Sequence, residues 1–336
     1  MSGLAPILSI KDLKLHFPVR GRGFGATRWL KAVDGVSFDV FPGETLGIVG
    51  ESGSGKSTIG RAVLQLLKPT AGRVVWLGEN IAGFSRSKMM PYRRQMQIVF
   101  QDPLASLNPR MTAGDIIAEP LDTFEPNLSA GERKKRVQEI MDKVGLLPQM
   151  INRYPHEFSG GQNQRIGIAR AMILKPKLIV ADEPVSSLDV SIRAQIINLL
   201  SDLQAEMGVA LIFISHDLAV VRHVSHRVLV LYLGKVMELA EASVLLSKPR
   251  HPYTQALLSA IPVPRPGRTR QPIVLKGDVP SPMRPPPGCH FHTRCAYAEA
   301  RCKVERPLMR HVGAGHQAAC HLRDGPVAEV AATADA

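Results

Sequence analysis

Short apolar runs alternate with segments of helical spacing between residue 5 and about residue 241 of this chain. Four of the runs are rich in β-branched residues and bounded by turn signals, which is typical of buried parallel strands. They are TLGIVG at residues 45–50, KLIVAD at 177–182, ALIFIS at 210–215 and RVLVLYLG at 227–234. Helical spacing occurs at residues 56–67, 130–144 and 192–207. This alternation predicts an α/β domain built on a parallel sheet.

Two long segments depart from the alternation. Residues 111 to about 165 have mostly helical spacing and no clear strand pattern, so we expect a helical insertion there. Prolines are dense from residue 249 to 287, and because proline breaks helices and cannot donate to a strand ladder, we predict an extended connector. The last residues, VAEVAATADA, predict a frayed end. We expect a domain over 1–250 with a helical subdomain at about 102–165, an extension over 251–325 and a flexible tail over 326–336.

Composition narrows the class of protein. The 336 residues are 45% hydrophobic and 21% charged, which suits a folded protein with a sizeable core. No run of 18 apolar residues exists, and the first residues lack the basic and apolar regions of a secretion signal, so we expect a cytosolic protein. The net charge of +13 suits either an anionic partner, such as a nucleotide, a nucleic acid or a membrane surface, or simply a soluble basic surface.

The stretch IVGESGSGKST follows a predicted strand and opens a predicted helix, and it fits the phosphate-loop pattern G-x-x-x-x-G-K-[ST]. Its glycines let successive N–H groups converge on a phosphate, and the helix start adds a positive dipole. We expect Lys56 to bind the β- and γ-phosphates and Ser57 to ligate Mg²⁺. The expected ATP-binding residues of the loop are Gly50, Glu51, Ser52, Gly53, Ser54, Gly55, Lys56, Ser57 and Thr58.

Two carboxylates stand at the end of the predicted strand KLIVAD. An acidic residue at the carboxyl end of a strand beside a phosphate loop holds Mg²⁺, usually through water, and we assign this role to Asp182. We expect Glu183, the next residue, to orient and polarise an attacking water as general base.

A further motif reveals a family resemblance. In EFSGGQNQRIGIARAM, residues Ser159, Gly160, Gly161 and Gln162 match the signature sequence of ATP-binding cassette (ABC) ATPases, and the chain resembles this family along residues 5 to 250. Other family marks occur in the family's order. They are the Q-loop residue Gln101, the D-loop residues Ser187, Leu188 and Asp189, and the switch residue His216. Asn163 departs from the family pattern, which has a longer polar or basic side chain there.

The resemblance implies a fold and a catalytic arrangement. The fold is a P-loop NTPase of the ABC type, with a RecA-like core, an antiparallel β region and a helical subdomain. Phe17 stands where the family stacks an aromatic ring on adenine, and Phe24 and Trp29 are weaker candidates because an insertion follows Phe17. Two cassettes face each other, so that each ATP lies between Gly50–Thr58 of one and Ser159–Gln162 of the other. The implied catalytic residues are Glu183, His216 and Gln101, and the implied Mg²⁺ ligands are Ser57, Gln101 and Asp182.

A narrower resemblance concerns the segment after the ATPase domain. The HPYT sequence at 251–254, the proline-rich connector, the spaced cysteines and SLNPRMTAGDIIAEPL after Gln101 resemble the ATPases of oligopeptide and dipeptide importers, in particular their F-type subunits. This implies a second ABC ATPase subunit as partner, expected to be a paralogue although a second copy stays open. It also implies two transmembrane permease subunits, an extracytoplasmic peptide-binding protein and a peripheral place on the cytoplasmic face of the membrane.

Other functions stay open at this point. The same class of transporter carries other cargo, such as nickel, glutathione or antimicrobial peptides. A non-transport ABC ATPase acting on nucleic acid is the alternative class, but a single uninterrupted cassette argues against it, so we expect no direct nucleic-acid contact. We also expect residues 102 to about 120, which follow Gln101, to form the groove that receives a helix of the permease.

All four cysteines lie between residues 289 and 320. Structural disulfides are rare in the cytosol, so the clustering suggests a metal site. A [4Fe–4S] cluster takes four thiolates, and the resemblance implies such a cluster on Cys289, Cys295, Cys302 and Cys320. Zinc is the alternative, with four cysteines or with His290, His292, His316 or His321 in place of a thiolate. A third interpretation is that the cysteines are reduced and inert.

Overall fold

The computed structural model of this chain describes residues 4–19, 28–261 and 272–322. Phe24, part of the predicted connector and the predicted frayed end lie outside the described residues. The chain divides into two compact units. The helical unit comprises Met1–Pro6, Val40–Thr45 and Phe84–Ile214, and the P-loop unit comprises Ile7–Asp39, Leu46–Gly83 and Ser215–Ala336.

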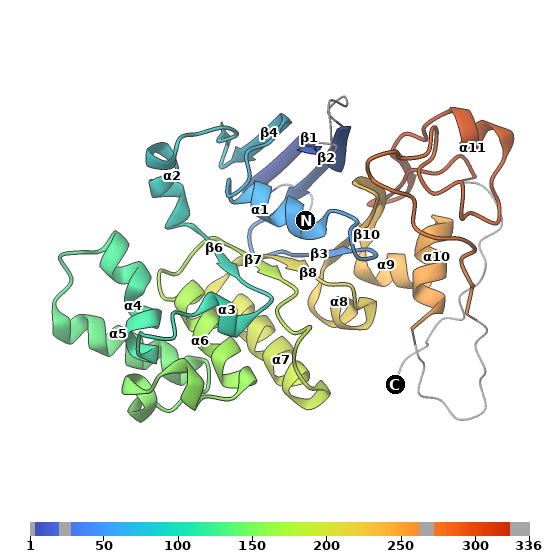
Figure 1. Cartoon of the computed structure of the whole chain (residues 1–336). Coiled ribbons are helices and arrows are strands. Elements are labelled where there is room, and N and C mark those ends of the chain that lie inside the picture. Colours follow the sequence, from blue (N-terminus) through green and yellow to red (C-terminus); the bar gives the residue numbers. More distant parts are fainter. Residues whose placement is uncertain (1–3, 20–27, 262–271, 323–336) are drawn as a thin grey trace, which may run out of the picture. The chain divides into compact units, whose positions relative to one another are not determined.

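The helical unit is built on three parallel strands. β6 (Met96–Val99) pairs with β7 (Leu178–Asp182), which in turn pairs with β8 (Ala210–Ile214). Every residue of β7 and β8 is buried, which confirms the prediction made from their apolar runs. The helices are α2 (Arg86–Arg93), α3 (Pro103–Ser106), α4 (Ala113–Phe124), α5 (Ala130–Lys143), α6 (Gly160–Met172) and α7 (Val190–Met207), with 3₁₀ turns η1 (Pro148–Asn152) and η2 (Pro155–Glu157). Helices α3 to α7 lie together on one side of the three strands (Figure 1).

Short polar side chains determine where these helices begin. Ser129 Oγ accepts a hydrogen bond from Glu132 N, while the Glu132 carboxylate accepts one from Ser129 N, so α5 starts with a complete capping box. Thr112 caps α4 in the simpler way, by accepting from Asp115 N. Residues 111–165 are all described and contain helices and turns but no strand, as the predicted helical insertion requires.

The P-loop unit contains two groups of strands. The first has the order β2-β1-β4-β5, in which β1 (Leu8–Val19), β4 (Ala71–Trp76) and β5 (Glu79–Asn80) pair antiparallel and β2 (Arg28–Val40) lies at the edge. In the second group, β3 (Thr45–Val49) pairs parallel with β9 (Arg227–Tyr232), and β10 (Lys235–Glu241) pairs antiparallel with β9. The predicted strands at 45–50 and 227–234 are therefore confirmed.

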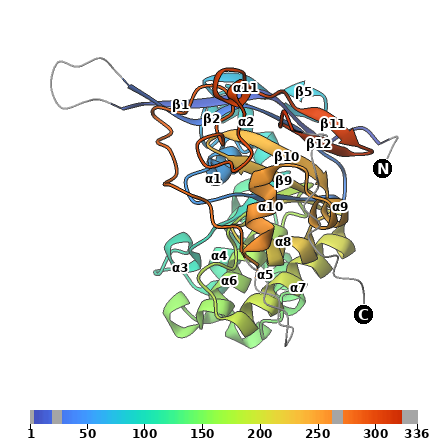
Figure 2. The same ribbon diagram turned by 90° about the vertical axis from the view of Figure 1, so that its right-hand side faces the viewer.

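Helices complete the P-loop unit. They are α1 (Lys56–Val63), α8 (Leu218–Val224), α9 (Ala242–Ser247), α10 (Pro252–Ser259) and α11 (Ala300–Val304). Figure 2 shows α8, α9 and α10 beneath β9 and β10. α1 ends four residues before the predicted Leu67, because Gln65 takes a left-handed conformation with φ of 51°. No helix in the described part of the chain has the length and apolarity needed to cross a membrane.

The predicted extended connector is wrong at its beginning, because Pro252–Ser259 form the helix α10. Pro252 occupies the first turn, where a helix leaves its N–H groups unbonded, and His251 Nδ1 caps the helix by accepting from Tyr253 N at 3.1 Å. Proline therefore starts a helix here instead of preventing one. The described residues 272–287 contain no helix or strand, as an extended connector requires.

The end of the described chain adds two strands to β9 and β10. β12 (His316–Ala318) pairs antiparallel with β10, and β11 (Arg310–Gly313) pairs with β12. Neither strand is predicted by the sequence, because each is only three or four residues long and has no regular alternation. We call residues 272–322 the C-terminal segment. The predicted boundary at residue 250 stays a prediction, since the compact units group this segment with the phosphate loop.

Candidate ATP-binding site and C-terminal cysteines

The predicted phosphate loop runs from the end of β3 to the start of α1. A Cβ atom on Gly50 would lie 2.1 Å from Leu231 O, so this position admits only glycine. Lys56 is buried, and its Nζ donates to the carbonyl oxygens of Gly50 at 2.8 Å and Glu51 at 3.0 Å. The ammonium group is held across the loop, at the start of the helix, where it can meet a phosphate together with the loop's N–H groups.

The predicted base stands at the end of β7 in the helical unit. Glu183 has a left-handed φ of 47°, and its N–H donates to Ile214 O on β8 at 3.0 Å. This backbone conformation costs a non-glycine residue of the order of 1 kcal/mol and is frequent at functional sites. Gln101 Nε2 donates to Glu183 Oε2 at 3.3 Å. The structure therefore brings together two of the three predicted catalytic residues, next to the buried Asp182.

The D-loop residues lead from Glu183 into α7. Ser186 Oγ and Ser186 N both donate to Glu183 O, at 3.1 and 3.3 Å, so the chain turns immediately after the base. Leu188 is buried, and Asp189 is the residue that precedes the first turn of α7. The turn thus links the predicted base directly to α7.

The signature residues open α6 through a capping box. Ser159 Oγ accepts from Gln162 N at 3.3 Å, and Gln162 Oε1 accepts from Ser159 N at 2.9 Å. Asn163, the departure from the family pattern, is buried, and its Nδ2 donates to Pro155 O and Phe158 O at 3.0 and 3.3 Å. A short amide at this position thus fastens the turn that precedes the signature.

The remaining predicted site residues belong to the P-loop unit. Phe17 is half-buried near the end of β1, whereas Trp29 on β2 is 48% exposed. His216 is exposed in the turn between β8 and α8, directly before Asp217, which caps α8. The predicted site is therefore divided: Phe17, the phosphate loop and His216 lie in one compact unit, and Gln101, Asp182, Glu183 and the signature lie in the other.

The four cysteines lie close together, and none forms a disulfide. Cys289 N donates to Cys302 O at 2.9 Å. Burial, together with the nearby thiols of Cys302 and Cys295, raises the pKa of Cys289 to about 11. Burial and the three other thiols likewise raise the pKa of Cys320 to about 11. The thiols thus form one group, in which burial favours the protonated forms of Cys289 and Cys320.

The described residues contain no group of three or more His, Cys, Asp or Glu side chains arranged to hold a metal ion. The histidines considered as zinc ligands already bond to protein groups. His290 bonds to Leu233 O and Arg306, His292 to Cys289 O, His316 to Glu238 and His321 to Glu305 O. Burial lowers the pKa of His290 to about 4. The structure therefore groups the thiols but shows no formed metal site.

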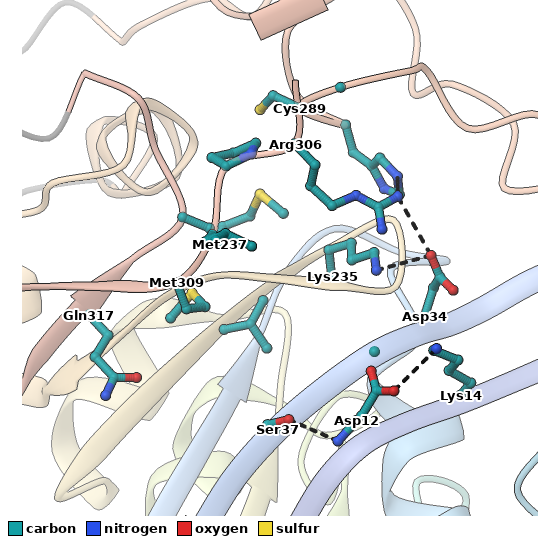
Figure 3. A pocket seen from close by; sticks show the side chains of 17 residues that line it. Asp12, Lys14, Asp34, Ser37, Lys235, Met237, Cys289, Arg306, Met309 and Gln317 are labelled. Carbon is teal, nitrogen blue, oxygen red and sulfur yellow. Dashed lines mark hydrogen bonds and ion pairs between the residues drawn. The ribbon is translucent and has the colours of Figure 1, made fainter. Parts of the chain in front are cut away.

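A cavity of about 440 Å³ opens in the P-loop unit beside Cys289 (Figure 3). Its charged lining is internally paired: Lys235 lies 3.0 Å and Arg306 3.7 Å from Asp34, and Lys14 lies 3.2 Å from Asp12. Burial raises the pKa of Asp34, but the hydrogen bond and charge of Lys235, helped by further cationic neighbours, outweigh it and lower the pKa to about 2. The cavity thus points to no charged ligand.

Two residues that the sequence analysis gave no role reach the phosphate loop. Tyr253 OH accepts from Glu51 N at 2.9 Å, and Arg294 forms an ion pair with the Glu51 carboxylate at 2.7 Å. Tyr253 belongs to the HPYT sequence, so the motif draws attention to this residue. The local sequence does not predict its contact with Glu51, which lies 202 positions earlier.

Two models of protein families match the chain. The ABC transporter model matches residues 33–186, and the model of the oligopeptide/dipeptide transporter C-terminal region matches residues 237–302. Together they cover the phosphate loop, the signature and three of the four cysteines, of which Cys302 is the last residue of the second match.

Relatives match across most of the chain. The oligopeptide transport ATP-binding protein OppF of Salmonella typhimurium is 56% identical over 308 residues, which covers 90% of this chain and 92% of that protein. The oligopeptide transport ATP-binding protein AppF of Bacillus subtilis is 54% identical over 320 residues, covering 94% and 97%. Among solved structures, the dimeric ATP-binding cassette MJ0796 with bound ADP and Pi has a TM-score of 0.63 and 30% identity, over 70% of this chain and 98% of that one.

The phosphate loop around Lys56, the base candidate at the end of β7 and the capped signature turn define an ABC ATPase. The two family models and the relatives confirm this class and refine it. The chain belongs to the family of ATP-binding subunits of oligopeptide/dipeptide ABC transporters.

Proposed function

We propose that this chain binds and hydrolyses ATP between two cassettes and thereby powers the import of oligopeptides or dipeptides. The observation that carries the proposal is that one chain joins the phosphate loop around Lys56 to an oligopeptide/dipeptide C-terminal region at residues 237–302. Relatives whose names specify oligopeptide transport support it, since they match 90–94% of the chain.

The binding half of the site uses charge. Lys56 meets the β- and γ-phosphates, and Ser57, Gln101 and Asp182 would hold Mg²⁺. The donor set fits this ion, because Mg²⁺ prefers oxygen ligands and Asp182 is a buried carboxylate at the end of a strand. Held by these residues, the ion would supply positive charge to neutralise the charge that develops on the phosphates. Phe17 stacks on the adenine ring.

The reacting half of the site positions water. Glu183 accepts a proton from the attacking water as general base, and the hydrogen bond from Gln101 Nε2 orients the carboxylate. His216 contacts the γ-phosphate and helps to place the water. Because Gln101 can touch both the Mg²⁺ site and Glu183, it links the arrival of nucleotide to the position of the base.

The second cassette completes the site with Ser159, Gly160, Gly161 and Gln162. The capping box supports this role, because it leaves the start of α6 preformed as an anion site before any nucleotide arrives. The solved cassette MJ0796, whose title describes a dimer with ADP and Pi, is a precedent for such an arrangement. Closure of the dimer excludes bulk water from the site, and hydrolysis of ATP lets the dimer open again. This opening and closing drives transport.

The partners are a second ABC ATPase subunit, expected to be a paralogue, two permease subunits and, indirectly, an extracytoplasmic peptide-binding protein. The chain then lies on the cytoplasmic face of the membrane. Residues 102 to about 120 dock to the permease. Leu104 in α3 is 57% exposed, while Arg170 Nη1 holds the end of α3 by donating to Ser106 O at 2.8 Å. An exposed apolar side chain on a fastened turn suits a docking contact.

Transport is the decisive test. The chain is reconstituted in proteoliposomes with its partner ATPase, permease pair and binding protein, and uptake of a labelled tetrapeptide is measured. We expect uptake that requires ATP and disappears with Lys56→Ala. ATP-driven uptake of nickel or glutathione without peptide uptake would contradict the peptide cargo. Cysteines placed at Leu104 should crosslink to the permease in an ATP-sensitive manner, and crosslinks confined to the C-terminal segment would refute the docking assignment.

We also infer that Cys289, Cys295, Cys302 and Cys320 bind one metal centre. The grouping of four unpaired thiols supports the proposal, and a [4Fe–4S] cluster is the first candidate because it takes four thiolates. Protein purified without oxygen should then be brown and contain about four irons per chain. One zinc per chain would establish the alternative instead, and metal-free protein with an ordered C-terminal segment would refute both. Cys295→Ser should lose the metal, whereas Ser281→Ala in the same segment should retain it.

A further inference from the structure

Two contacts from the C-terminal region meet at Glu51, the second residue of the phosphate loop. The Glu51 N–H donates to Tyr253 OH at 2.9 Å, and the Glu51 carboxylate pairs with Arg294 at 2.7 Å. These partners lie 202 and 243 residues away in sequence. One residue of the loop is thus held by its backbone and by its side chain at once, from two different elements.

Both partners are themselves fixed in place. Tyr253 is completely buried, and its ring lies 4.8 Å from the ring of Tyr232 and 5.2 Å from that of Phe291, measured between centroids. The Arg294 side chain is 9% exposed, and its guanidinium lies 6.0 Å from the Tyr232 ring centroid. Aromatic packing and a cation–π contact therefore hold both partners of Glu51, the acceptor Tyr253 and the donor Arg294, against one aromatic cluster.

The cluster is anchored to the sheet. Glu238 on β10 is fully buried, and its carboxylate accepts from Arg250 N at 2.7 Å and His251 N at 2.9 Å, just before α10 begins. The same carboxylate bonds to His316 Nε2 on β12 at 2.6 Å. Glu238 thus ties the helix that carries Tyr253 to the strand that ends the C-terminal segment.

The ion pair between Arg294 and Glu51 changes the charge near the phosphate-binding site. Glu51 places a negative charge beside Gly50 and Lys56, where a triphosphate carrying several negative charges must bind. An unpaired carboxylate there repels the nucleotide, and the interaction is strong because the Glu51 side chain is only 25% exposed. Arg294 neutralises that charge and draws it toward the C-terminal segment.

We propose that Tyr253 and Arg294 are positioning residues for ATP binding: Tyr253 sets the backbone of the phosphate loop, and Arg294 neutralises Glu51. The inference rests on the proposed function, since it assumes that ATP is the ligand of the loop. Arg294 lies in the turn between Cys289 and Cys295, in which Arg294 N donates to Phe291 O at 3.0 Å. The conformation of that turn is therefore transmitted to the phosphate loop.

The test is a charge-rescue experiment on the full chain, with ATP affinity measured by titration and ATPase activity measured in the transporter. Arg294→Gln should weaken ATP binding and raise KM about 5- to 20-fold, with kcat within about twofold of wild type. Glu51→Gln should bind ATP more tightly than wild type, because it removes a negative charge from beside the phosphates. The double variant Glu51→Gln with Arg294→Gln should return to the affinity of Glu51→Gln alone, and Arg294→Lys should retain most of the affinity.

Arg301→Gln is the matched control, because Arg301 lies in the same segment but forms an exposed pair with Glu305. It should leave ATP affinity unchanged. Tyr253→Phe keeps the ring and removes the hydroxyl, so it should raise KM about threefold without lowering the melting temperature by more than a few degrees. A double variant as weak as Arg294→Gln alone would show that the pair only supports the fold, and would overturn the inference.

Two outcomes separate this inference from the proposed function. Wild-type protein that fails to bind ATP would refute the proposed function itself. Wild-type protein that binds ATP, together with Arg294→Gln and Glu51→Gln variants of unchanged affinity, would refute only the inference. If Arg294→Gln does not fold, the Glu51→Gln variant alone still decides, since a marked loss of ATP affinity in that variant contradicts the proposed repulsion.

Discussion

The phosphate loop and the signature turn are both rich in glycine and serine and both open a helix, yet they are held in opposite ways. The signature turn caps itself, because Ser159 and Gln162 bond to each other across three residues. The phosphate loop depends on Tyr253 and Arg294, which come from the other end of the chain. A local cap survives distant changes, whereas a loop held from a distance is sensitive to the whole unit that surrounds it.

The largest expected effect comes from removing the general base, which takes part in the reaction itself, unlike Tyr253 and Arg294, which only position the phosphate loop. Glu183→Gln should reduce ATP turnover about 10²- to 10⁴-fold while ATP binding persists, because a positioned base contributes that much and the amide cannot accept the proton. The ATP-bound dimer should accumulate, which size-exclusion chromatography detects. Asp202→Asn on α7 is the control and should keep its turnover. Near-normal steady-state ATPase of Glu183→Gln in the intact transporter would overturn the role of Glu183.

The buried anchor behind the phosphate loop comes next. Glu238→Ala should destabilise the P-loop unit by about 3–5 kcal/mol, because it removes one partner of a buried charged network. Denaturant unfolding followed by circular dichroism measures the loss. Glu241→Ala, on the exposed end of the same strand, should cost less than about 1 kcal/mol. Equal effects of the two variants would show that Glu238 is not an anchor.

Lys56→Ala tests the phosphate loop directly. We expect ATP affinity to fall about 10- to 100-fold, as the loss of a charge-assisted contact predicts, with hydrolysis lost as well. Nucleotide titration by calorimetry measures the affinity. The exposed Lys68→Ala should behave as wild type. Retained affinity in Lys56→Ala would mean that the loop's N–H groups bind the phosphates without the lysine.

The pH dependence of stability tests the ion pairs of Asp34 with Lys235 and Arg306. The backbone of Asp34 is connected to the phosphate loop through Gly234, since Asp34 N donates to Gly234 O and Gly234 N donates to Ser54 O. The pKa of Asp34 falls from 3.8 to about 2 on folding, so its stabilisation is present above about pH 4 and is lost as the pH falls toward 2. The loss should be about 1–2 kcal/mol after allowance for solvent screening. The Asp34→Asn variant should be less stable than wild type at neutral pH. Its free energy of unfolding should also change less between about pH 4 and pH 2. Parallel stability curves for the two proteins would rule out this contribution.

The smallest effect belongs to the turn that caps itself. Ser159→Ala should cost about 1 kcal/mol of stability in the helical unit, while Ser159→Asn, which keeps a capping oxygen, should cost only a few tenths. Chemical denaturation of the isolated full chain is the measurement. A cost of 3 kcal/mol or more for Ser159→Ala would show that the signature turn, too, depends on distant contacts.

Several features of this protein follow from sequence alone, because they depend on neighbours along the chain. Apolar runs predict the buried strands β3, β7, β8 and β9, and helical spacing predicts α5, whose cap at Ser129 also uses only neighbouring residues. The phosphate loop is recognisable for the same reason, since glycines, Lys56 and the flanking strand and helix are contiguous. The role of Gln101, whose side chain bonds to Glu183 in the structure, is anticipated only through the resemblance to a family.

Tertiary structure alone decided the rest. The proline-rich stretch does not predict α10. The first turn of this helix tolerates Pro252, because an N–H group at that position would have no bonding partner within the helix. The strands β11 and β12 are too short to show a period and exist because β10 offers them an edge. Glu51 and Arg294 are 243 residues apart, and nothing in either local segment marks the other. Hydrophobic burial specifies which faces turn inward, but folding in three dimensions selects which distant charges meet, and here it placed the C-terminal segment against the phosphate loop.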